Sequence, residues 1–237
     1  AMCKSGIDVL ELGVPYSDPV MDGLVIQEAT MQALENGFKL KQTFDAVKAI
    51  TAAVDTPVLV MTYWNPVLSY GVEKFAHDLA EAGGAGLITP DLIPDEAGEW
   101  LAASDKYDLD RVFLAAPTSS TERMQTACEL SRGFVYAVST MGITGARNEV
   151  DQLAKTVVSN IRTASTSANA AVGIGISTAE QVADVNTYAD GAIVGSAFVR
   201  AYQEGGIEAL KYVRTRDFDG RGDIGRMRSE EHTSELR

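Results

Sequence analysis

The sequence is poor in the residues that build most metal sites, catalytic triads and disulfide frameworks. Its 237 residues include only two histidines, His77 and His232, and two cysteines, Cys3 and Cys128, which have no CxxC spacing. We therefore expect both cysteines to be free thiols, and we expect no bound metal and no His-based catalytic site.

Positive charge and long apolar runs are also scarce. Lys and Arg number 20 against 33 Asp and Glu, for a net charge of −13, and the basic residues form no stripe. This balance argues against a nucleic-acid partner, and a phosphorylated small molecule would have to be held locally by backbone amides. No run approaches the roughly 18 apolar residues of a membrane span, and no charged-then-apolar leader opens the chain, so we expect a cytoplasmic protein without membrane contact.

The chain instead alternates short apolar runs with amphipathic segments. A strand followed by a helical pattern recurs about every 25 to 30 residues, which predicts βαβ units and a parallel sheet. Acids and glycine turns at the ends of so many strands favour an α/β fold of the (β/α)8 TIM-barrel type over an open doubly wound sheet. Seven strands are predicted, the second to eighth of a barrel lacking its first strand: residues 7–12, 57–62, 85–89, 111–116, 134–139, 171–176 and 191–194. The predicted helices cover residues 24–36, 40–54, 72–82, 95–104, 121–130, 150–164, 177–186 and a last segment from about 196.

Two carboxylates stand out at the end of the first predicted strand. Glu11 interrupts an apolar strand, and burying an ionised carboxylate costs several kcal/mol, so such a residue is either paired or has a raised pKa. Asp22 follows in a loop rich in Gly and Pro. Together they form a candidate acid/base pair, although the residues alone favour an edge-strand ion pair for Glu11 and a turn-forming role for Asp22.

Glycines mark the last strand-to-helix junctions. Gly173 and Gly175 interrupt one predicted strand near its end, with Ser177 and Glu180 as a capping box for the next helix, and Gly195 follows the last strand. Barrels often bind phosphate at these two junctions, on backbone amides and helix N-termini. Each glycine signal alone is more often a simple turn, but the two reinforce one another.

The segment E-L-G-V-P-Y-S-D-P-V-M-D-G at 11–23 resembles the signature of the tryptophan synthase alpha subunit family. The similarity continues through residues 62–66, 133–147, 173–177 and 194–196 and covers about 7–212. It implies a (β/α)8-barrel lyase that cleaves indole-3-glycerol phosphate to indole and glyceraldehyde 3-phosphate by a retro-aldol reaction, in tryptophan biosynthesis. It also implies no metal or organic cofactor in this chain, with indole passing to a pyridoxal-phosphate beta subunit in an α2β2 heterotetramer.

The same resemblance implies a role for individual residues. Glu11 would be the general acid/base, with the higher pKa of the two acids, and Asp22 would hold the indole N–H. Thr144 would meet Asp22 when two loops close, and Asp18 and Pro19 would face the beta subunit, unless they serve only as turn residues. The phosphate would lie against Gly145, Gly175, Gly195 and Ser196. The indole side of the pocket would be lined by Ile26, Tyr63, Ile88, Pro90 and Tyr136, for which ordinary barrel core is an equally open interpretation.

The chain departs from the family pattern at both ends. The family's first helix and strand are missing before about residue 7, which would leave two unpaired strand edges. We expect a single barrel domain over 1–213 and an irregular tail over 214–237. From about 228 the tail resembles a translated sequencing adapter, so His232 is not a catalytic candidate.

Two alternatives to the lyase stay open. One is another phosphate-binding barrel enzyme, which would share the glycine junctions but not the acidic signature. The other is a catalytically incomplete barrel that only binds and activates the beta subunit.

Overall fold

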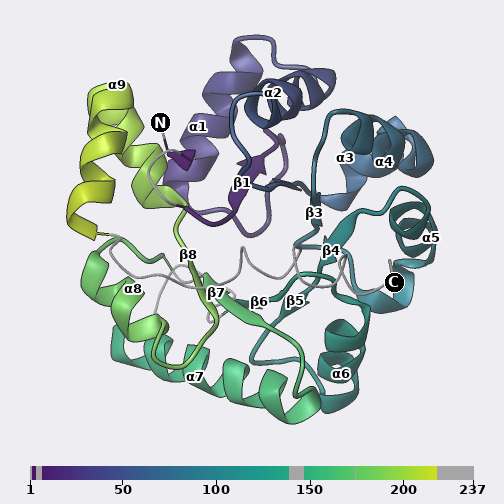
Figure 1. Ribbon diagram of the computed structural model, residues 1–237, viewed down its shortest axis with the longest axis vertical. Helices are drawn as coiled ribbons and strands as arrows, with labels where there is room; N and C mark the ends of the chain where they lie inside the picture. Colours follow the sequence, from purple (N-terminus) through teal and green to yellow (C-terminus); the bar gives the residue numbers. More distant parts are fainter. Residues whose placement is uncertain (1, 4–6, 139–146, 174, 218–237) are drawn as a thin grey trace, which may run out of the picture.

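A ring of parallel strands surrounded by helices forms the protein (Figure 1). The computed structural model describes residues 2–3, 7–138, 147–173 and 175–217. The strands are β1 (Leu10–Gly13), β2 (Val58–Met61), β3 (Gly86–Ile88), β4 (Asp110–Val112), β5 (Leu114–Ala115), β6 (Val135–Val138), β7 (Ala170–Gly173) and β8 (Gly191–Ile193). They pair in two parallel sheets, in the orders β1-β2-β3-β4 and β5-β6-β7-β8.

One extended segment joins the two sheets. The predicted strand at 111–116 is divided at Phe113, because β4 pairs with β3 while β5 pairs with β6. The Phe113 carbonyl accepts the Tyr136 N–H at 3.0 Å, and its own N–H donates to Ser131 Oγ at 3.3 Å. Seven extended segments therefore form one barrel wall, as predicted. Among the described residues, β1 pairs only with β2 and β8 only with β7.

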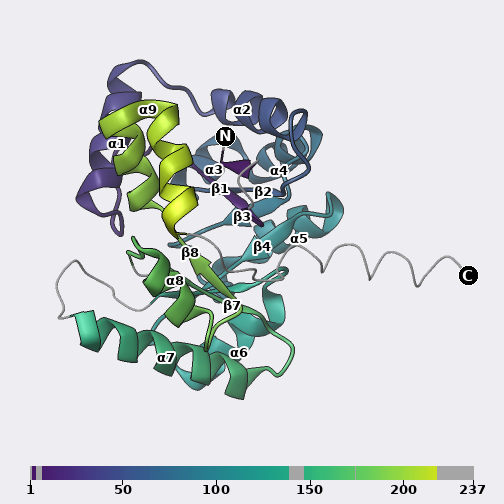
Figure 2. The same ribbon diagram turned by 60° about the vertical axis from the view of Figure 1, so that its left-hand side comes forward.

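Helices cover the outside of this wall. They are α1 (Leu24–Glu35), α2 (Lys41–Thr51), α3 (Trp64–Tyr70), α4 (Val72–Glu81), α5 (Gly98–Lys106), α6 (Thr121–Leu130), α7 (Arg147–Ala164), α8 (Ala179–Val185) and α9 (Ser196–Asp217), with a 3₁₀ turn, η2 (Pro94–Glu96). α9, which follows β8, packs beside α1, which follows β1 (Figures 1 and 2). The helices α1 and α9 thus pack together although the strands β1 and β8 that precede them are not paired with each other.

Three local expectations need correction. Helix α3 was not predicted, because Pro66 suggests a loop; it lies in the first turn, where its missing N–H has no intrahelical partner to lose. The capping box of α8 is formed by Thr178 and Gln181, one residue later than the predicted Ser177 and Glu180. α9 continues to Asp217, so residues 214–217 are helical rather than irregular.

The alternation of the strands separates the barrel interior from the helix layer. Leu10 and Leu12 pack with the cluster that joins β2 to the helices, whereas Val9 packs with the interior cluster built on Leu59 and Ala171. Because successive side chains of a strand point to opposite faces, Glu11 points with Val9 into the barrel. The strand pattern alone therefore places the first candidate acid inside the barrel.

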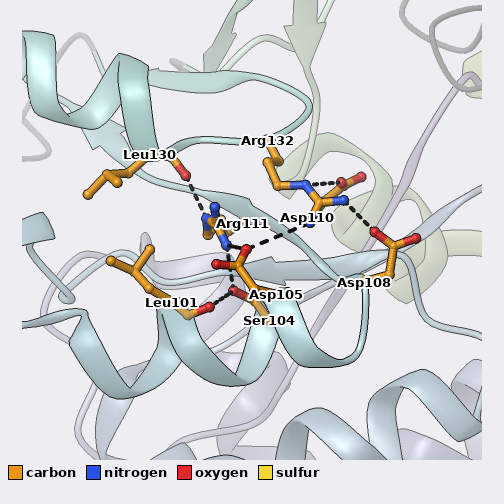
Figure 3. A network of polar contacts seen from close by, with 8 residues as sticks. All are labelled: Leu101, Ser104, Asp105, Asp108, Asp110, Arg111, Leu130 and Arg132. Atoms are coloured by element: carbon orange, nitrogen blue, oxygen red, sulfur yellow. Dashed lines mark hydrogen bonds and ion pairs between the residues drawn. The ribbon is translucent and has the colours of Figure 1, made fainter. Parts of the chain in front are cut away.

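A polar network ties the N-terminal side of β4 to its neighbours (Figure 3). Arg111 donates from Nε to the Leu130 carbonyl at 2.7 Å and from Nη1 to Ser104 Oγ at 2.9 Å, and it also pairs with Asp105. Arg132 donates to Asp108 at 2.6 Å and lies 3.7 Å from Asp110. The side chain of Arg111 is only 11% exposed, so its bonds to Ser104 and to the Leu130 carbonyl join α5, β4 and α6 in a partly buried setting, whereas its partner Asp105 is 62% exposed.

We expect Arg111→Met to destabilise the fold by about 2 to 3 kcal/mol, because it leaves the Leu130 carbonyl and the buried Ser104 hydroxyl without their charged donor. Urea unfolding measures the change. The matched control, Arg123→Met, removes an arginine that is 62% exposed and should cost less than about 0.5 kcal/mol. Equal losses in the two variants would contradict this role of the network.

Candidate active site

Glu11 carries the carboxyl that is most strongly affected by its surroundings. It lies in β1 opposite Leu59 of β2, and protein atoms surround its carboxyl group although the residue keeps some exposed surface. Burial raises the pKa of Glu11 from 4.5 to about 7, in the expected direction. Near neutral pH the group is therefore divided between the acid and the carboxylate, which suits it to donating and accepting a proton.

Tyr136 lies on β6 in the same interior. Burial first, and then the nearby charge of Glu11, hold the pKa of the Tyr136 hydroxyl well above its usual range, so the hydroxyl stays protonated. A Cβ added to Gly173 would lie 2.2 Å from the Tyr136 hydroxyl oxygen. Gly173, the last residue of β7, thus leaves the room that the tyrosine occupies, a role different from the turn expected there.

Tyr63 organises the loop that carries Asp22. Its hydroxyl accepts the N–H of Val20 at 3.2 Å and of Met21 at 2.9 Å, and it donates to the Asp22 carboxylate. Tyr63 is only 5% exposed, and its ring stacks at a tilt against Tyr16 at 5.3 Å. The sequence suggests a pocket-lining residue here; nothing local indicates that its hydroxyl would hold a loop 42 residues away in the chain.

The backbone at Asp22 is fixed by its connection to α1. The side chain of Gln27 donates to the Asp22 carbonyl at 2.6 Å, and Gly23 caps the N-terminus of α1. Burial raises the pKa of Asp22 as well, and the hydrogen bond from Tyr63 opposes that shift. Only for Glu11 is the rise large, so the two acids differ in the direction that acid/base chemistry requires.

A cavity of about 350 Å³ opens beyond the C-terminal ends of β7 and β8. Gly175, with a φ of +67°, and Ser196, the first residue of α9, lie in its wall. The positive φ explains the glycine at 175, since other residues rarely adopt that conformation. The cavity therefore lies at the predicted phosphate end of the site rather than around Glu11. Its wall is formed by Gly175, Ser177, Ser196, Ala197, Arg200, Ala201 and Glu204.

The other predicted site residues are found at strand ends and turns. Ile88 is fully buried in the barrel interior at the end of β3, and Pro90 is partly buried in the turn that follows. Ile26 is partly buried in the first turn of α1, and Gly195 is exposed before α9. Thr144 and Gly145 lie outside the described residues. Asp18 is exposed and Pro19 partly exposed on the loop between β1 and α1.

Two expected absences can be compared with the described part of the chain. Within it, no group of three or more His, Cys, Asp or Glu side chains is placed to hold a metal ion. Its helices include none that is long and apolar enough to cross a membrane. Cys3 and Cys128 are free thiols.

The features described so far belong together on one face of the molecule. The buried carboxyl lies within β1, and the loop acid and the glycine-lined cavity follow the C-terminal ends of parallel strands, where barrels of this kind have their active sites. They define an enzyme of the (β/α)8-barrel class with a candidate acid/base pair.

The chain belongs to the tryptophan synthase alpha chain family, whose model matches residues 1–218. The tryptophan synthase alpha chain of Leifsonia xyli subsp. xyli is 63% identical over 209 residues, covering 88% of this chain and 80% of the relative. That of Mycobacterium avium is 56% identical over 211 residues, covering 89% and 77%. The solved structure of Mycobacterium tuberculosis tryptophan synthase matches with a TM-score of 0.83 and 53% identity, over 89% of this chain and 80% of that one. The resemblance stated from the motifs is confirmed.

We expect Glu11 to make stability depend on pH. Because its pKa is raised in the folded state, its protonation stabilises the fold fully below pH 4.5, and this contribution is lost as the pH rises to about 7. Glu11→Gln cannot ionise, so its stability relative to the parent should rise by on the order of 3 kcal/mol between about pH 4.5 and 8.

Urea unfolding of both proteins across this range measures the difference. Glu28→Gln, at an exposed position of α1, is the matched control and should change the pH profile little. Parallel profiles for Glu11→Gln and the parent would contradict a raised pKa at Glu11.

Proposed function

We propose that this chain is the alpha subunit of a tryptophan synthase and cleaves indole-3-glycerol phosphate to indole and glyceraldehyde 3-phosphate. The observation that carries the proposal is the Glu11 carboxyl inside the barrel, with a pKa of about 7. A family membership that covers residues 1–218 supports the same reaction.

The reaction needs two proton transfers and the cleavage of one carbon–carbon bond. Protonation of the indole ring carbon that carries the glycerol chain makes the ring cationic. Removal of the proton from the adjacent hydroxyl lets its oxygen electrons form the aldehyde, and the electrons of the breaking bond return to the ring. Glu11 supplies the acid for the first transfer and, as a carboxylate, accepts the hydroxyl proton in the second.

Asp22 acts on the other side of the indole ring. Positive charge spreads to the ring nitrogen when the ring carbon is protonated, and a carboxylate beside the N–H stabilises that charge. The Tyr63 hydroxyl, bonded to the amides of Val20 and Met21, holds Asp22 for this contact. Tyr63 is thus a positioning residue in addition to lining the pocket.

The remaining predicted residues have places in the same reaction. Ile26, Ile88, Pro90 and Tyr136 line the indole side, and Thr144, for which the family resemblance implies a contact with Asp22, lies outside the described residues. Gly175, Gly195 and Ser196 hold the phosphate through backbone amides and the Ser196 hydroxyl, and Gly145, which the resemblance adds to this set, lies outside the described residues. The proton transfers drive the bond cleavage, and the indole ring itself takes up the electrons of the breaking bond, so this chain needs no organic cofactor, and pyridoxal phosphate belongs to the beta subunit. A cytoplasmic location stays a prediction.

The beta subunit binds at the loop that carries Asp22. Asp18 is exposed on this loop, and the apolar side chains of Val20 and Leu24 beside it are 76% and 64% exposed. Exposed apolar residues next to a polar rim are typical of a protein interface. Binding there places the partner next to Asp22, where indole is released.

A second function is favoured by the strand pairing. Among the described residues, β1 and β8 are not paired with each other, so the described wall is open on one side of the indole pocket. A barrel in this state binds and activates the beta subunit without cleaving the substrate.

We expect Glu11→Gln and Asp22→Asn each to lower indole release from indole-3-glycerol phosphate by about 10² to 10⁴-fold, because each removes a group that acts in the transition state. Indole is measured with and without a tryptophan synthase beta subunit, and Glu28→Gln is the control with unchanged activity. Full activity in either acid variant would show that the substituted acid has no catalytic role. No indole from the parent chain, together with stimulation of the beta subunit, would select the second function.

Tyr63→Phe should lower kcat about 10-fold and change KM for indole-3-glycerol phosphate by less than about 3-fold, since the lost hydrogen bonds position Asp22 rather than bind substrate. Hydrogen exchange of the Val20 and Met21 amides should quicken in the same variant. An unchanged kcat despite faster exchange would show that the loop is held but that its position does not affect the reaction.

A further inference from the structure

The cavity at the ends of β7 and β8 contains one side chain of each charge. Arg200 and Glu204, both on α9, line it together with Gly175 and Ser196. Its volume of about 350 Å³ is at the lower end of the range for small-molecule sites. The cavity is therefore large enough for the phosphate end of a substrate. Its wall carries a positive charge at Arg200 and a negative charge at Glu204.

The position of Arg200 on α9 directs it to the phosphate. Arg200 lies four residues after Ser196, so the two side chains share one face of the helix. Side chains of a helix lean toward its N-terminus, which brings the guanidinium back toward the first turn, where free amides and the helix dipole attract an anion. Glu204 lies one turn further along the same face and away from that end.

The overall charge makes a local cation important. At a net charge of −13 the protein repels a phosphate dianion, and this repulsion is weakened only by local positive groups. The sequence predicts binding by backbone amides alone, because it shows no basic stripe. None of the ion pairs between described residues involves Arg200, whereas Arg111, Arg123, Arg132 and Arg162 each pair with an aspartate.

We propose that Arg200 binds the phosphate of the substrate and that Glu204, on the same wall, opposes it. The pair sets how strongly the site prefers a phosphorylated substrate over its unphosphorylated counterpart. This inference rests on the proposed function, because it assigns the phosphate of that reaction to this cavity.

The first experiment measures binding of inorganic phosphate to the full chain by titration calorimetry. Arg200→Gln should weaken binding about 10-fold, and Glu204→Gln should tighten it about 2- to 3-fold, because charge-assisted contacts are strong and a like charge nearby is repulsive. Arg200→Lys should keep most of the affinity, since lysine also binds phosphate. Arg123→Gln removes the same charge from an exposed position on α6 and should leave the affinity within about 2-fold.

The second experiment measures KM for indole-3-glycerol phosphate in the same variants. Arg200→Gln should raise KM about 10-fold and leave kcat within about 3-fold, because the phosphate is bound equally before and during the reaction. Phosphate binding by the parent chain that is unchanged in Arg200→Gln, or no phosphate binding at all, would overturn the inference. Phosphate binding that depends on Arg200 without any indole release would support the inference and contradict the proposed catalysis.

Discussion

The burial of one carboxyl group inside a parallel barrel is the constraint on which the chemistry depends. Glu11 shares the interior with apolar side chains, because the two-residue period of β1 directs Val9 and Glu11 to the same face. Desolvation there disfavours the charged form and brings the pKa to about 7. The unfavourable desolvation free energy of Glu11 is offset by apolar burial in the clusters between the strands and the helices, where residues such as Phe75 and Val58 are fully buried.

The two ends of the barrel have different tasks. On the N-terminal side of β4, the largely buried Arg111 and the partly exposed Arg132 pair with aspartates that are 62% and 73% exposed, and they join neighbouring elements in a structural role (Figure 3). On the C-terminal side, Glu11 is carried by a strand, Asp22 by a loop held through Tyr63, and part of the cavity wall by the start of α9. A strand, a loop and a helix start therefore meet at this end of the barrel, and the proposed function assigns a part of the reaction to each.

Much of this arrangement could be predicted from local patterns. The seven wall segments and most helices follow from apolar periodicity, and the bounds of α6 agree with the prediction at both ends. Glu11 and Asp22 were found as candidates because a charge in an apolar strand and an acid in a glycine-rich loop are visible along the chain. Helix α3 was missed because Pro66 within it suggests a loop, and the cap at Thr178 was missed because the neighbouring Ser177 offers an equally plausible local signal.

The sequence by itself determined which face of β1 carries Glu11 and where strands give way to helices, since both depend on residues close together in the chain. Only the tertiary structure decided the change of partner at Phe113, the hydrogen bonds from Tyr63 to the loop of Asp22, and the contact of Tyr136 with Gly173. It also placed Arg200 in the wall of the same cavity as Gly175. These contacts join residues that are distant in sequence, and their distances and desolvation arise only when the barrel brings the strand ends together.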